Sequence, residues 1–82
     1  MHRMLVGTAQ CRKLPVRYYL LAEELHNETE TYGVGVEYDG TLAEIHGITI
    51  SQRRITALLY ALIMGTVTPI ALRDVVEDWL LT

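Results

Sequence analysis

The sequence predicts a small α+β domain, in which a three- or four-stranded antiparallel meander precedes two C-terminal helices packed on one sheet face. In the first half of the chain, apolar residues alternate with polar ones, as in strands that bury one face. In the last third, apolar residues recur at helical spacing. A chain of 82 residues makes one domain, so we expect a single unit over residues 1–82. Residues 1–14 are its uncertain part, either an extra strand or a flexible arm.

Three segments have the composition and alternation of strands, and they span Val16–Leu25, Glu30–Tyr38 and Thr41–His46. Asp39-Gly40 predicts a two-residue type I′ turn between the second and third of them. We expect Pro15 to break any element before the first strand and Gly47 to end the third.

The Asp39-Gly40 turn fixes a register in which Val36 lies opposite Ala43 and Gly33 opposite His46. Matching apolar faces in the other hairpin puts Leu20 opposite Val34 and Arg17 opposite Glu37. One face of the sheet, here called the core face, then carries Tyr18, Leu20, Ala22, Tyr32, Val34, Val36, Tyr38, Ala43 and Ile45. The other, here called the polar face, carries Arg17, Tyr19, Leu21, Glu23, Gly33, Gly35, Glu37, Leu42, Glu44 and His46. We expect the helices to cover the core face and leave the polar face in water.

Ser51–Thr82 predicts two amphipathic helices that form a helical hairpin. Ser51 and Thr68 are candidate N-caps, and Pro69 suits the first helical position. Gly65 stands where a left-handed residue would end the first helix. Neither helix can hide its apolar stripe alone, so both must pack on each other and on the sheet.

Composition limits the function. The net charge of −3 counts against a nucleic-acid module, which usually has a basic excess. The single Cys11 cannot form an internal disulfide, and the N-terminus lacks a signal peptide, so we expect a cytoplasmic protein. The longest apolar stretch is too short to span a membrane. Half of the residues are apolar, a large share for a chain of marginal size, and this favours a homodimer.

The polar face is the candidate partner-binding surface, through Arg17, Tyr19, Glu37, Glu44 and His46. Glu37, Glu44, His46 and Tyr19 could also be acid–base groups, but catalysis needs a pocket, and a flat sheet rarely encloses a substrate. The plainer interpretation is that they are ordinary exposed strand residues.

A second candidate is the acidic face of the last helix, formed by Asp74, Glu77 and Asp78. It could hold a cation or a basic partner. The alternative is a solvated helix face on which Arg73 and Glu77 form an i, i+4 pair.

Smaller features have similar pairs of interpretations. Gly33 and Gly35 indicate either close approach by a partner or room for Tyr19 and Leu21. Tyr60 and Met64 lie toward the edge of their helix, where a dimer contact is possible. Cys11 is expected to be structural or incidental.

Several short motifs resemble a family of short bacterial proteins known only as a domain of unknown function. They are Tyr18-Tyr19-Leu20-Leu21, Tyr32-Gly33-Val34 with Val36-Glu37, Ile48-Thr49, Val67-Thr68-Pro69 and Asp74-Val75-Val76-Glu77-Asp78-Trp79. The resemblance runs from about Arg17 onward and implies a small bacterial cytoplasmic protein. It carries over no functional residue.

The chain shows no nucleophile–base pair, phosphate-binding loop or metal-ligand spacing, so we expect no catalytic residue, no cofactor and no metal. We expect a non-enzymatic protein–protein interaction module that acts as a homodimer, with an unknown protein partner and neither membrane nor nucleic acid. One alternative is a DNA-binding helix-turn-helix protein, although the second helix would bring Asp74, Glu77 and Asp78 toward phosphates. A small enzyme or metal-binding protein is the other.

Overall fold

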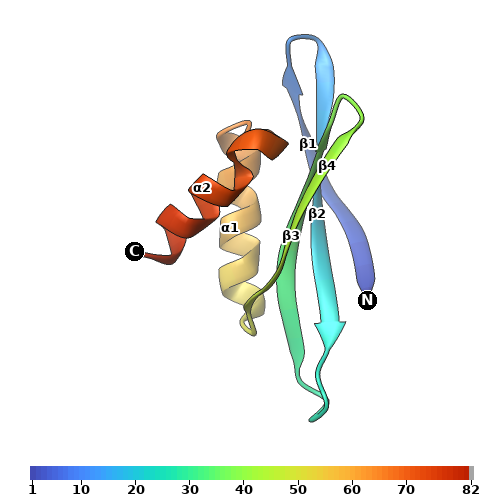
Figure 1. Cartoon of the computed structure of the whole chain (residues 1–82), viewed down its shortest axis with the longest axis vertical. Coiled ribbons are helices and arrows are strands. Elements are labelled where there is room, and N and C mark those ends of the chain that lie inside the picture. The colour runs from blue at the N-terminus through green and yellow to red at the C-terminus, as the bar shows by residue number, and fades with distance from the viewer. Residues whose placement is uncertain (82) are drawn as a thin grey trace.

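The computed structural model describes residues 1–81 and consists of a four-stranded antiparallel sheet with two helices on one of its faces (Figure 1). The strands lie in the order β1-β2-β3-β4, so each one pairs with its neighbour in sequence. The elements are β1 (His2–Cys11), β2 (Leu14–Glu24), β3 (Glu30–Tyr38), β4 (Thr41–Thr49), α1 (Gln52–Met64) and α2 (Pro69–Leu80). The expected fold class is confirmed, in its four-stranded form.

The additional strand, β1, pairs along β2 through a tight turn at Arg12-Lys13. Both turn residues have positive φ, 50° and 70°, as the two central residues of a type I′ turn require. We expected Pro15 to break any element before the first strand. This expectation is wrong, because Pro15 pairs with Gln10 inside the hairpin. Pro15 lies beyond the last β2–β3 pair, Val16–Tyr38, so its missing N–H costs no bond to β3.

The register expected for β2, β3 and β4 is confirmed over most of its length, including Leu20–Val34, Arg17–Glu37 and Val36–Ala43. It fails at one place. After Val34–Ile45 the next β3–β4 pair is Tyr32–Thr49, so the expected Gly33–His46 pair does not form. Three residues of β4 bulge opposite Gly33 alone, and β4 continues to Thr49 rather than ending at Gly47.

The bulge explains why residue 33 is a glycine. A Cβ atom built on Gly33 would lie 2.2 Å from the Ile45 carbonyl oxygen and 2.8 Å from the His46 Cα. Gly47 takes up the bend with φ of 63°, a value that glycine adopts without strain. The close approach at Gly33 is therefore made by the chain's own backbone.

The helix ends follow the expected signals except at Gly65 and at the Thr68 side chain. Ser51 caps α1, with its hydroxyl oxygen accepting from the Arg54 N–H at 3.2 Å. Gly65 is not the left-handed residue, because its φ is −88°. Thr66 has that conformation, with φ of 48°, and the N–H of Val67 reaches back to the Leu62 carbonyl at 3.0 Å. This is a Schellman ending with a threonine in the usual glycine position.

The helix α2 begins with Pro69 in its first turn after Thr68, as expected, although the Thr68 side chain makes no capping bond. No helix within residues 1–81 is long and apolar enough to cross a lipid bilayer.

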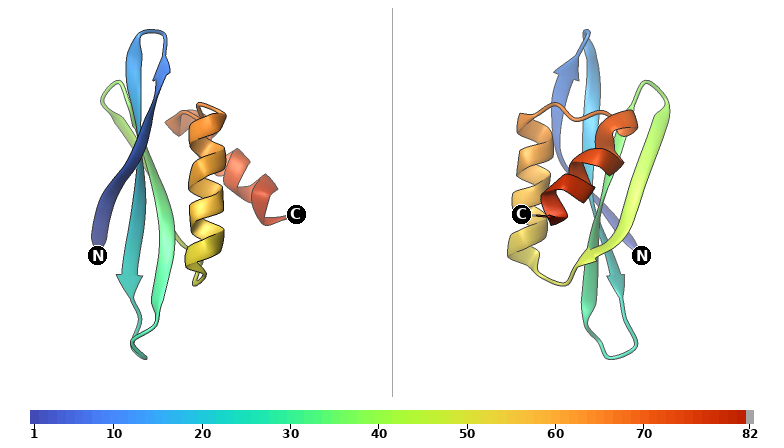
Figure 2. Two further views of the ribbon diagram at one scale, coloured as in Figure 1. Left: turned by 180° about the vertical axis from the view of Figure 1, so that it is seen from behind. Right: turned by 60° about the vertical axis from the view of Figure 1, so that its left-hand side comes forward.

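Both helices lie on the core face, as expected (Figure 2). The cluster of buried side chains joins sheet and helices, and it consists of Val16, Tyr18, Tyr32, Val34, Val36, Ile55, Leu58, Leu59, Leu62, Leu72 and Val76. Tyr18 is fully buried, and its hydroxyl donates a 2.9 Å hydrogen bond to the Val67 carbonyl in the connection between the helices. Burial raises the pKa of Tyr18 to about 12. With the helices fixed on the core face, the opposite face is left open.

Candidate functional site

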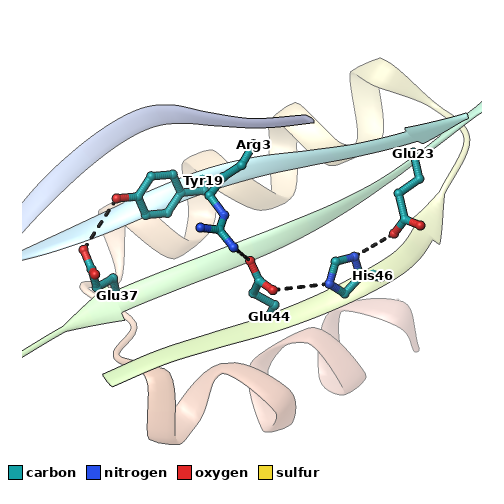
Figure 3. A network of polar contacts seen from close by, with 6 residues as sticks. All are labelled: Arg3, Tyr19, Glu23, Glu37, Glu44 and His46. Carbon is teal, nitrogen blue, oxygen red and sulfur yellow. Dashed lines mark hydrogen bonds and ion pairs between the residues drawn. The ribbon is translucent and has the colours of Figure 1, made fainter. Parts of the chain in front are cut away.

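The candidate site is the polar face of the sheet, which no helix covers (Figure 1). All five residues expected there, Arg17, Tyr19, Glu37, Glu44 and His46, lie on it and come from β2, β3 and β4. Strand alternation brings them to one side of the sheet. Polar contacts also join these residues in two groups, and Figure 3 draws all five except Arg17.

One group of contacts centres on Glu37. The Arg17 Nη1 lies 3.3 Å from Glu37 Oε1, and the Tyr19 hydroxyl donates to the same oxygen at 3.5 Å. Arg17 and Glu37 are direct cross-strand partners, so their side chains meet without any bend in the strands. Because both are well exposed, the pair adds at most about 1 kcal/mol to stability.

The other group centres on Glu44 and spans all four strands. Arg3 on β1 forms an ion pair with Glu44 on β4. The other oxygen of that carboxylate lies 3.4 Å from His46 Nε2, and His46 Nδ1 lies 2.7 Å from Glu23 Oε1 on β2. The Arg3 guanidinium also lies over the Tyr19 ring, 5.8 Å from its centre, and so joins the two groups.

Leu21 is buried beneath this network. It points to the polar face, between its strand partners Arg3 and Gly33, yet it is only 1% exposed. Neither α1 nor α2 lies on this face, so we infer that neighbouring side chains of the sheet cover Leu21. The charged groups are thus held in fixed positions over a small apolar centre.

Sequence reasoning missed two members of the network, Arg3 and Glu23. Glu23 was expected on the polar face, but nothing in the sequence indicated that His46 would reach it. Arg3 belongs to the N-terminal segment whose structure was left open, so its neighbours were unknown. The only available signal for Arg3 was strand alternation within β1.

The other expected residues lie elsewhere. Asp74, Glu77 and Asp78 are exposed on α2, and within residues 1–81 the expected Arg73–Glu77 pair does not form. No three His, Cys, Asp or Glu side chains in that range are placed to hold a metal ion.

Tyr60 and Met64 project from α1, with exposed fractions of 64% and 68%. Cys11 packs at the edge of the core, and its carbonyl accepts from the Tyr38 hydroxyl at 3.2 Å.

The polar face presents charges of both signs on a flat surface. The cations Arg3 and Arg17 lie on β1 and β2, while Glu37 and Glu44 lie on β3 and β4. A surface of this kind can select a complementary surface by charge and steer its approach. The hollows large enough for a small molecule are on the other side of the sheet, between β4 and α2.

The model of a family of unknown function, DUF6514, matches residues 2–82. No curated protein and no solved structure matches the chain.

Proposed function

The chain belongs to the DUF6514 family, a family of unknown function, and we propose from its own surface that it is a non-enzymatic protein-interaction module that acts as a homodimer. The observation that carries the proposal is the network on the polar face. Seven side chains from all four strands are joined there by ion pairs, hydrogen bonds and one cation–π contact.

The properties of this face suit a protein partner. It is open, and it bears arginine and tyrosine, which are enriched in protein interfaces. It also carries both charge signs, which can give a partner specificity. Its charged groups already hold each other in place, so binding has little side-chain freedom to freeze. A partner surface with the opposite charge pattern would pair with it on contact.

The homodimer is supported by the amount of surface. The chain exposes 5528 Å², whereas monomeric proteins of this mass, 9.3 kDa, expose roughly 5,000 Å². Many large apolar side chains are among the exposed ones, with Ile70 at 95%, Met64 at 68% and Ile50 at 67%. A second copy would cover part of this surface.

The alternatives have less support. A helix-turn-helix reader would lay α2 along DNA, yet the exposed side of α2 carries Asp74, Glu77 and Asp78 against Arg73. An enzyme would need several reacting groups aimed into a pocket, and in the described part of the chain Glu44 is the one network residue among those that line the two hollows beside α2. The single cysteine keeps a reducing cytoplasm as the expected compartment.

The test is affinity capture from the native cell lysate with the tagged protein and two charge-reversed variants. Arg17→Glu changes the polar face, and Arg53→Glu makes the same change of charge on exposed α1, away from that face. We expect wild type and Arg53→Glu to recover the same protein in stoichiometric amount, and Arg17→Glu to lose it. Circular dichroism would establish that both variants fold. Equal recovery by all three, or no recovery by any, would contradict the proposal.

A further inference from the structure

A groove runs between the free edge of β4 and the first turns of α2. Its two adjoining hollows have volumes of about 410 Å³ and 350 Å³, and both are lined by Ala43, Pro69 and Ile70. Figure 2 shows α2 lying over this side of the sheet, next to β4. The groove is therefore bordered by an unpaired strand edge on one side and a helix on the other.

Ile70 stands at the rim of this groove and is 95% exposed, more than any other large apolar side chain of residues 1–81. An isoleucine in this position costs free energy as long as water surrounds it. It lies next to an apolar hollow that it does not fill. We propose that a second copy of the chain binds here about a two-fold axis, so that Ile70 of each copy fills the groove of the other. The inference rests on the proposed homodimer and names its interface.

The backbone of β4 is ready for such pairing. Thr41 closes the tight turn, so Thr41, Ala43 and Ile45 bond to β3, and the N–H and C=O groups of Leu42 and Glu44 point outward. Antiparallel pairing of β4 with β4 of the second copy puts Leu42 opposite Glu44 and Ala43 opposite itself on the axis. The small Ala43 then leaves room for the two Ile70 side chains between the helices.

Charged residues line both ends of the groove. Asp39 lies at one end, and Arg73 lies at the other together with Glu44 and Asp74. Neither Asp39 nor Arg73 makes an ion pair within residues 1–81. A two-fold axis at Ala43 turns the groove end for end, which brings Arg73 of each copy toward Asp39 of the other. The same surface would thus be self-complementary in both shape and charge.

A stable dimer needs an interface of standard size. A standard interface covers about 800 Å² per partner, which is roughly a seventh of the 5528 Å² that the chain exposes. The other sheet edge is less suited, because a bulge between Leu5 and Gly7 interrupts β1 near its middle. The regular run Thr41–Ile45 on β4 borders the groove along its whole length.

The first test is sedimentation equilibrium of the full chain, comparing Ile70→Glu with Met64→Glu. Both positions are exposed helix residues, so neither change disturbs the core. We expect a wild-type dimer, a dissociation constant raised by at least about 100-fold in Ile70→Glu, and no change in Met64→Glu. A wild-type monomer at about 100 µM, or a dimer that Met64→Glu weakens and Ile70→Glu does not, would overturn the interface.

The second test is a charge exchange between Asp39 and Arg73. Asp39→Arg and Arg73→Asp should each weaken the dimer, and the double variant should restore it. Arg12 and Lys13 occupy the same left-handed conformation in the other hairpin, so an arginine at position 39 suits its turn. If the dimer of the double variant is weakened by the sum of the two single effects, the proposed pairing of Asp39 with Arg73 is wrong. These outcomes are separate from the capture experiment. A monomer that still binds its partner through the polar face refutes the homodimer and this interface but leaves the partner-binding role intact, whereas a dimer that Ile70→Glu does not weaken refutes this interface alone.

Discussion

The sharpest prediction concerns two glycines that lie two residues apart on the same face of β3. Gly33→Ala should lower the free energy of unfolding severely, whereas Gly35→Ala should be tolerated. A Cβ on Gly33 would lie 2.2 Å from the Ile45 carbonyl oxygen, 2.8 Å from the His46 Cα and 3.1 Å from the Ile45 carbonyl carbon. All three are backbone atoms of β4, and they cannot move aside as a flexible side chain would. On Gly35 the nearest atoms would be Glu44 Cγ at 3.5 Å and Tyr19 Cβ at 3.6 Å, which are ordinary contacts.

The size of the Gly33 effect follows from the movement that it requires. Restoring a normal contact means shifting β4 by about 1 Å, which strains the neighbouring pairs Val34–Ile45 and Tyr32–Thr49. Overpacking together with weakened backbone hydrogen bonds should cost about 3–5 kcal/mol. The whole domain is expected to have only about 4–12 kcal/mol of stability. Gly35→Ala should instead change stability by between zero and about +1 kcal/mol, because glycine inside a strand is costly.

Urea unfolding followed by Trp79 fluorescence and by circular dichroism measures both variants. The slope of the unfolding free energy against urea concentration should be the same in Gly35→Ala and wild type. Their unfolding midpoints can then be compared directly. If the two variants differ in unfolding free energy by less than about 1 kcal/mol, the close approach of the β4 bulge to Gly33 is wrong. A folded Gly33→Ala with wild-type stability would mean that β4 does not cross so close to β3.

Three further predictions concern the helices and their attachment. Thr66→Gly should raise the unfolding free energy by about 1 kcal/mol, seen as a higher melting temperature, because a left-handed threonine costs roughly that much. Tyr18→Phe should lower it by about 1–3 kcal/mol by leaving the Val67 carbonyl without its donor. Since the folded pKa of Tyr18 is raised to about 12 from 10.0, wild type should keep this contribution below pH 10 and lose it as pH rises toward 12. Alkaline melts of Tyr18→Phe should lack that part of the decline; an equal decline in both proteins would contradict the assignment. Arg54→Ala should cost about 0.5–1 kcal/mol and change Trp79 emission, because the guanidinium lies 4.7 Å from the ring centre; unchanged emission and stability would show that the contact is not formed in solution.

The central part of the fold was predictable because its signals are local. Asp39-Gly40 is a strong turn sequence, and alternation on both sides of it leaves one register in which the apolar faces agree. The two amphipathic helices followed in the same way from the spacing of apolar residues. These features need no knowledge of distant parts of the chain.

The N-terminal hairpin was not predictable for the opposite reason. Arg12-Lys13 lacks the Gly, Asn or Asp that marks a tight turn, and the backbone there is held left-handed by the pairing of β1 with β2. Pro15 normally ends a strand, and its tolerance here depends on where β3 stops. Thr66 is a similar case, since tertiary packing places a β-branched residue where sequence rules expect glycine.

The candidate site shows the same division. Alternation placed the β2, β3 and β4 residues on the polar face, but the contact of His46 with Glu23 follows from the bulge. Without a side chain on Gly33, nothing on β3 stands between His46 and β2, and the imidazole reaches across to Glu23 (Figure 3). Gly35, two residues further along β3, also lacks a side chain on this face. Arg3 of β1 forms its ion pair with Glu44 of β4 near this position.

The two glycines therefore have more than one role. Gly33 lets the β4 backbone approach β3 closely. Because neither Gly33 nor Gly35 has a side chain, charged side chains from the neighbouring strands can meet above both positions. A partner or extra room for apolar neighbours is not needed to explain them. The network on the polar face and the bulge in β4 thus depend on the same residues, so any change that straightens β4 should also separate His46 from Glu23. For this reason the proposed partner surface and the stability of the sheet are expected to be lost together in Gly33→Ala, but not in Arg17→Glu, which alters the surface and leaves the bulge intact.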